Sequence, residues 1–275
     1  MVIFDPFTDT GGGLEMLFRW GHVLSGITWI GLLYFFNFVQ TPAYAELSPA
    51  ARGEAFDKLT WRALWWFRWA AALTFLTGVT ILGIQKNLGP DFADYFAGKQ
   101  GTSIAWGAIL GTIMFLNVWG VIWRAQKVVI ASERDKLAGG EGDPAQAGAA
   151  KKAARASRAN TLFSIPMLFF MLFTSHFAIV GNYADPDGGV MVGAWAIFIV
   201  IVAFIELSAL GLLGGLDNFF NKAAFDKHRN TIIAGFVVWA LLFFGGWELI
   251  IGEQDTAPVS GDTTPVSVTV AESGG

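Results

Sequence analysis

The stretch VMVGAWAIFIVIVAFIELSALGLL, from Val190 to Leu213, decides the fold class, because Glu206 is the only ionisable residue within it. A helix that crosses the hydrocarbon core of a bilayer needs about 20 mainly apolar residues, and this stretch exceeds that length. Without water, a single apolar segment can satisfy its own backbone polar groups only as an α-helix. The stretch therefore predicts a membrane-spanning helix.

Five more stretches along the chain have the same apolar character. They are Leu14–Val39, Trp61–Ile84, Ser103–Trp123, Ala159–Val180 and Thr231–Ile251. The composition agrees, because 54% of the residues are hydrophobic and 15% are charged, whereas soluble domains have about 25% charged residues. We predict an all-α fold, a polytopic transmembrane bundle of about six helices within residues 1–251. Its surroundings are then a lipid bilayer, and we expect no nucleic-acid partner.

Basic residues gather in three of the predicted loops, between spans one and two, three and four, and five and six. The loop between the third and fourth spans holds the largest group: Arg124, Lys127, Arg134, Lys136, Lys151, Lys152, Arg155 and Arg158. Short cytoplasmic loops of membrane proteins carry such an excess of Lys and Arg. We therefore predict that both chain ends are extracytoplasmic (N-out, C-out), in a multi-pass protein of the bacterial inner membrane.

Three segments do not read as spans. Residues 139–157, rich in Gly, Ala and Lys, indicate a mobile cytoplasmic linker. Residues 252–275, rich in Thr, Val, Pro, Ser and Gly, indicate a disordered extracytoplasmic tail. The stretch Pro90–Gly98 is too short to span and is expected at the membrane interface. The sequence has no Cys, which excludes disulfides, zinc–thiolate sites, iron–sulfur clusters and covalently attached haem.

Two histidines form an outer layer of polar residues inside the predicted bundle. At about 1.5 Å per residue, His22 in the first span and His176 in the fourth lie at similar depths below the extracytoplasmic surface. Two imidazoles at matched depth on different helices are typical of a site that ligates the iron of haem b. Gly26 and Trp29 share the face of His22, where the Gly would admit a flat macrocycle and the indole would pack on it. Arg19, one turn away, would pair with a propionate or another anion.

The same two histidines are also compatible with a structural role. Each imidazole would then be a buried polar group that bonds to a neighbouring helix. The third histidine, His228, lies in a basic loop and is expected to be solvated.

Arg68, Asn117 and Glu206 form an inner layer, each about seven to nine residues from the predicted cytoplasmic end of its span. An ionisable group in the membrane is costly, so a structural ion pair between Arg68 and Glu206 is the simplest expectation. An anion site or a proton path from the cytoplasm is the alternative. A cation–π role for Arg68 is a further one, because indoles surround it in the sequence: Trp61, Trp65, Trp66 and Trp69.

The run RWGHVLSGITWIG, residues 19–31, resembles the first helix of the membrane domain of the urate hydroxylase (PuuD) family. The stretch from Pro166 to His176 resembles a later helix of that domain. The resemblance implies urate oxidation, with electrons leaving through a C-terminal cytochrome c domain. Here residues 252–275 stand where that domain would begin and no Cys is present, so we expect a separate cytochrome c as acceptor. Arg19 is then the candidate to bind the urate anion.

The first span also resembles the HemJ-type protoporphyrinogen oxidases, whose first-helix histidine is a haem ligand. Together these features predict a membrane redox protein with haem b near the extracytoplasmic face, either a urate-hydroxylase-like dehydrogenase or an electron-transfer subunit. The alternative is a non-catalytic transmembrane subunit of a larger respiratory or photosynthetic complex. A transporter is less favoured, because the sequence shows neither an inverted repeat nor a pair of broken helices.

Overall fold

The structure is a computed structural model that describes residues 12–85, 95–96, 98–176 and 188–252. These residues form helices and turns without a strand, and six helices are long and apolar enough to cross a membrane. They are Gly13–Glu46, Pro49–Ile84, Lys99–Leu137, Gln146–His176, Gly188–Ala209 and His228–Glu248. The predicted all-α bundle is thereby confirmed. Most of the interfacial stretch 90–98 and nearly all of the tail 252–275 lie outside the described residues.

The first three long helices each combine α-helical and π-helical segments. The first consists of α1 (Gly13–Tyr34), η2 (Phe35–Gln40) and α2 (Thr41–Glu46). The second consists of α3 (Pro49–Ala55), η3 (Phe56–Thr60) and α4 (Trp61–Ile84), and the third of α6 (Lys99–Leu116), η4 (Asn117–Ile122) and α7 (Trp123–Leu137). Ser48 separates the first two, because its side chain caps α3 by accepting a 3.3 Å hydrogen bond from the Ala51 amide.

The remaining elements are α8 (Gln146–His176), α9 (Gly188–Ala209), α10 (Phe219–Phe225), α11 (His228–Ala240) and η6 (Leu241–Gly252). Since α8 begins at Gln146, most of the segment predicted as a mobile linker, 139–157, is helical. The physical reason is twofold. Alanine has the highest helix propensity, and Gln146 accepts a 2.7 Å hydrogen bond from Ser132 that ties the start of α8 to α7.

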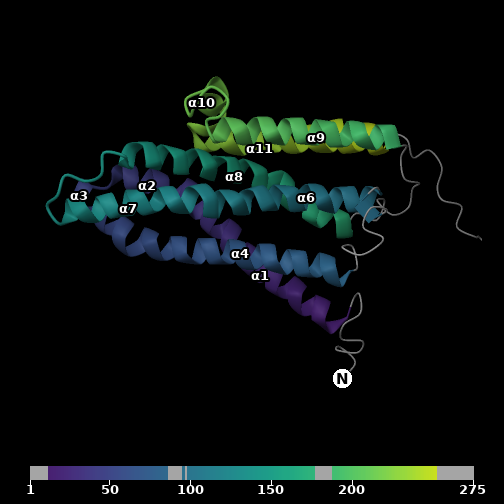
Figure 1. Cartoon of the computed structure of the whole chain (residues 1–275), viewed down its shortest axis with the longest axis horizontal. Helices are drawn as coiled ribbons and strands as arrows, with labels where there is room; N and C mark the ends of the chain where they lie inside the picture. The colour runs from purple at the N-terminus through teal and green to yellow at the C-terminus, as the bar shows by residue number, and fades with distance from the viewer. Residues whose placement is uncertain (1–11, 86–94, 97, 177–187, 253–275) are drawn as a thin grey trace, which may run out of the picture.

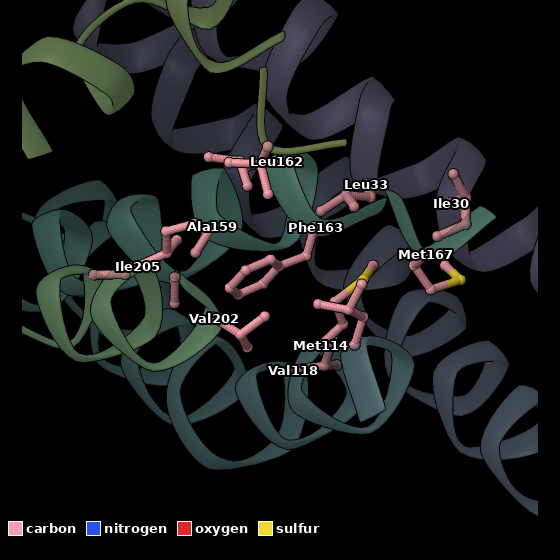
Figure 2. Close-up of a cluster of buried hydrophobic side chains, with 14 of the residues drawn as sticks. Ile30, Leu33, Met114, Val118, Ala159, Leu162, Phe163, Met167, Val202 and Ile205 are labelled. Atoms are coloured by element: carbon pink, nitrogen blue, oxygen red, sulfur yellow. The ribbon is translucent and has the colours of Figure 1, made fainter. Parts of the chain in front are cut away.

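The core lies around α8, which contacts α1, α6, α7, α9 and α11. Figure 2 shows Phe163 of α8 at its centre, fully buried among apolar side chains of other helices: Leu33, Met114, Val118, Val202 and Ile205. Lipid tails are as apolar as these side chains, so close van der Waals packing is what holds such a bundle together.

Figure 1 shows that α1 begins and η6 ends at the same end of the bundle. At the opposite end, α7 and the first turns of α8 extend beyond α9 and α11. That end carries the basic loops and is the predicted cytoplasmic side. The pair α1 and α4 pack on each other and diverge from α6 and α8 toward the end where α1 begins.

Candidate functional site

The imidazole of His22 packs against α4. Its Nδ1 lies 3.1 Å from the hydroxyl oxygen of Thr77, and that hydroxyl donates its single hydrogen to the carbonyl of Leu73 at 2.6 Å. The carbonyls of Leu73 and Thr74, 2.6 and 3.0 Å from this hydroxyl, can only accept, so the arrangement favours the tautomer of His22 with the proton on Nδ1. The Nε2 lone pair of His22 is left for another partner.

The residues around His22 on α1 form a close seam with α4. The hydroxyls of Ser25 and Thr74 are 3.0 Å apart, and a Cβ at Gly26 would lie 3.9 Å from a methyl of Thr74. Gly26 thus faces α4, where the expectation was an open face for a macrocycle. Trp29 is 2% exposed and belongs to the packed core.

Arg19 lies in an ion pair at the start of α1. Its Nε bonds a carboxylate oxygen of Glu15 at 2.6 Å, and Gln85 of α4 donates to the same oxygen at 3.1 Å. Much of the positive charge of Arg19 is therefore balanced within its own helix. A substrate anion or a propionate at this position would share the guanidinium of Arg19 with Glu15.

His176 is exposed at the end of α8, and its Nδ1 lies 3.1 Å from the carbonyl oxygen of Leu172. A carbonyl only accepts, so Nδ1 carries the proton and Nε2 keeps its lone pair. Within the described residues the rings of His22 and His176 make no contact with each other. Side-chain bonds join the first long helix to α8 nearer the opposite end, through Tyr34–Ser164 at 2.9 Å and Asn37–Ser157 at 2.8 Å.

The inner polar layer is arranged differently from the predicted ion pair. Glu206 accepts a hydrogen bond from the side-chain amide of Asn117 at 3.1 Å, and the same amide nitrogen bonds Asn160 at 3.0 Å. Asn160, which sequence reasoning missed, is fully buried and donates to the carbonyl of Met114 at 2.9 Å. Its only signal was an amide at the start of an apolar run. The predicted pairing of Arg68 with Glu206 is therefore wrong.

Arg68 instead lies among indole rings. Its guanidinium carbon is 4.0 Å from the ring centroid of Trp123, 5.6 Å from that of Trp119 and 5.8 Å from that of Trp69. The indole N–H of Trp119 also donates to the Arg68 carbonyl at 3.1 Å. Arg68 thus makes the cation–π contacts that were expected as an alternative to the ion pair. Two of the three rings, however, come from the third long helix and not from α4. The face of α4 that bears Arg68 is turned toward η4 and α7.

A cavity of about 340 Å³ lies at the predicted cytoplasmic end, between the first three long helices and α8. Arg52 and Arg158 line it, and no Asp or Glu is among the described residues of its wall. Arg158 is 8% exposed, and its buried Nη1 has no hydrogen-bond partner in the described structure. Sequence reasoning counted Arg158 only as a basic loop residue. Its position directly before the fourth apolar span was the available signal.

A shallower depression nearby, of about 400 Å³, is a weaker candidate for a binding site. Its wall includes Asp57, Lys58 and Arg134. Asp57 already pairs with both of these cations, with Arg134 at 2.5 Å and with Lys58 at 2.6 Å. A ligand would have to displace existing ion pairs there.

Comparison with known proteins finds one family. The sequence model of the family described as "Urate oxidase N-terminal" matches residues 91–244, which is more than half of the 275 residues. The matched region holds α6 to α11, including Arg158 and His176, and leaves out α1 with His22. No curated protein and no solved structure matches the chain.

Proposed function

The chain belongs to the urate oxidase N-terminal family, and from this membership we propose that it is a membrane redox protein that takes part in urate oxidation in a bacterial inner membrane. Urate would lose two electrons and two protons as it takes an oxygen atom from water. One-electron carriers would accept the electrons in turn. The proposed final acceptor is a cytochrome c, and none of these 275 residues is a Cys that would hold its haem.

We further propose that His22 and His176 hold haem b, which when bound would relay single electrons to the carrier. The observation that supports this is the tautomer of each imidazole. The contacts with Thr77 and with Leu172 favour Nδ1–H in the two rings, and that tautomer keeps the Nε2 lone pair. A fixed Nδ1–H is the usual outer-shell arrangement of a metal-ligating histidine. In this proposal Arg19, with Nε on Glu15, is the partner of a propionate.

The ligand proposal is tested by the haem content of detergent-purified variants. We expect His22→Ala and His176→Ala each to lose most of the b-type reduced-minus-oxidised spectrum. Thr77→Val keeps the shape of the side chain but removes the acceptor for Nδ1–H. It should weaken haem retention by roughly tenfold, which is typical for an outer-shell partner of a metal ligand.

His228→Ala is the matched control, because His228 is exposed at the start of α11, at the other end of the bundle. Its haem content should equal that of the unmodified protein. Normal spectra in both the His22 and His176 variants would refute the ligand assignment. A colourless unmodified protein, expressed with haem in excess, would favour the non-catalytic subunit instead.

A further inference from the structure

Arg158 differs sharply from its neighbour Arg155, one turn earlier on α8. Arg155 is 7% exposed and donates to the carbonyls of Leu216 and Asn221, each at 3.1 Å, and to Asp226 at 2.7 Å. These bonds hold the segment around α10 against α8. Arg158 is buried to the same degree but has no hydrogen bond or ion pair within the described part of the chain. A buried guanidinium without partners is costly unless a ligand satisfies it.

The charges and polar atoms of the cavity wall indicate the kind of ligand. Arg158 and Arg52 bring two positive charges with no carboxylate in the wall, which favours an anion. The side-chain oxygen of Gln126 is buried and has no hydrogen-bond partner in the described structure, so a ligand with an N–H group can donate to it. A ligand that meets both demands is an anion that also carries N–H groups.

The aromatic residues of the wall indicate a flat shape. Phe36, Tyr44 and Phe56 line the cavity, and the rings of Tyr44 and Phe56 pack edge to face at 5.0 Å. The hydroxyl of Tyr44 is held 2.9 Å from that of Thr60, which in turn donates to Gln40 at 3.2 Å. This wall is fixed by its own hydrogen bonds before a ligand arrives. The volume of about 340 Å³ lies within the range of about 300–1,000 Å³ of small-molecule sites.

Three π-helical segments meet at this cavity. Its wall contains residues of η2 (Phe36, Asn37, Gln40), of η3 (Phe56, Thr60) and of η4 (Ile122). A π-helical turn widens the helix and redirects side chains, and such turns are frequent at functional sites. At the rim, Thr41 and Ala45 of α2 and Ala150 and Ala154 of α8 are exposed. These small side chains leave an entrance between α2 and α8 at the predicted cytoplasmic end.

We infer that this cavity binds a small, planar organic anion with ring N–H groups, in which Arg158 holds the negative charge and Gln126 accepts from a ring N–H. Urate has all of these properties. The choice of urate as the ligand rests on the proposed function, whereas the chemical class follows from the cavity itself. The site would draw its ligand from the cytoplasm.

The test is calorimetric titration of urate into the purified, oxidised full chain, without any electron acceptor. Arg158→Gln should weaken urate binding by roughly tenfold or more, because a hydrogen bond to a charged group is lost. Arg158→Lys should recover part of the affinity, since it keeps the charge without the planar fork. Gln126→Leu should also weaken urate. Arg124→Gln is the control, because Arg124 is exposed on α7 and does not line the cavity.

Misfolding is excluded by the melting temperature without ligand. Arg158→Gln should melt no lower than the unmodified protein, because it removes an unpartnered buried charge. Inorganic phosphate is the second probe, since two arginines also suit a phosphate or a lipid headgroup. Unchanged urate affinity in Arg158→Gln, or binding of phosphate in place of urate, would overturn the inference. His22→Ala should still bind urate, so a failure of the haem proposal is distinguishable from a failure of this one.

Discussion

The environment of Arg68 shows how a single charged side chain is accommodated in this bundle. Its guanidinium lies 4.0 Å from the ring centroid of Trp123, while Glu206 bonds to Asn117. A cation over an indole gains about 0.5–2 kcal/mol, more as the pair is desolvated. The carboxyl of Glu206 instead relies on an amide network, whose members Asn117 and Asn160 are buried.

This arrangement predicts the outcome of two double-mutant cycles. Arg68→Ala combined with Trp123→Leu should show a coupling free energy of about 0.5–2 kcal/mol. Arg68→Ala combined with Glu206→Gln should be additive within about 0.5 kcal/mol, because the two side chains share no partner. The measurement is the free energy of unfolding in mixed detergent micelles. A strong coupling free energy between Arg68 and Glu206 would mean that the two side chains form an ion pair, which would contradict the structure.

The depth of polar residues in the membrane was predictable from the sequence, but their direction around the helix was not. Counting residues at 1.5 Å each placed Arg68, Asn117 and Glu206 in one layer, and Asn117 and Glu206 do meet. Which face of α4 bears Arg68 depends on how the helices pack, and a sequence rich in apolar residues on every side does not reveal that. For the same reason, the sequence did not reveal which neighbour Gly26 faces: a cofactor was expected there, and Gly26 instead faces Thr74.

At the scale of the elements, α11 approaches α8 closely at Gly235. A Cβ at this position would lie 2.5 Å from the Cδ1 of Ile165 and 3.1 Å from the carbonyl oxygen of Leu162. The side chain of Ile165 can turn aside, but the backbone oxygen cannot. Small residues at helix contacts are how membrane helices gain the packing that holds them together.

Gly235→Ala should therefore destabilise the bundle by about 1–3 kcal/mol, the usual cost of overpacking. Gly193→Ala is the matched control on α9, because its Cβ would meet no atom within 4 Å. The control should be neutral or stabilising by up to about 1 kcal/mol, through higher helix propensity. Thermal melts in detergent give both values. Equal melting temperatures for the two variants would contradict the close contact of α11 with α8.

The number of the spanning helices followed from hydropathy, whereas their full lengths and their interruptions did not. The predicted span Trp61–Ile84 has the bounds of α4. The π-helical segments η2, η3 and η4 have no signature in the order of apolar residues, so the cavity that they surround was not predicted. The start of α8 was also missed, because Ala-rich sequence suits both a linker and a helix, and contacts with α7 decide between them.

On the scale of the whole molecule, the two proposed sites lie toward opposite ends of the bundle. His22 and His176 belong to the predicted extracytoplasmic half, and Arg158 to the predicted cytoplasmic end. The family match over residues 91–244 includes Arg158 and His176 and excludes His22. Residues 19–31, which resemble the first helix of the family's membrane domain, lie outside the region that the family model matches. In the proposed function both parts serve one activity, the transfer of electrons from urate to a cytochrome.

The most direct test of that activity is the spectrum of the haem-loaded protein when urate is added without oxygen. We predict that urate reduces the b-type haem, that added cytochrome c then becomes reduced, and that Arg158→Gln slows both changes while its haem content stays normal. A protein that carries haem and binds urate, yet leaves both the haem and the cytochrome oxidised, would contradict the proposed function.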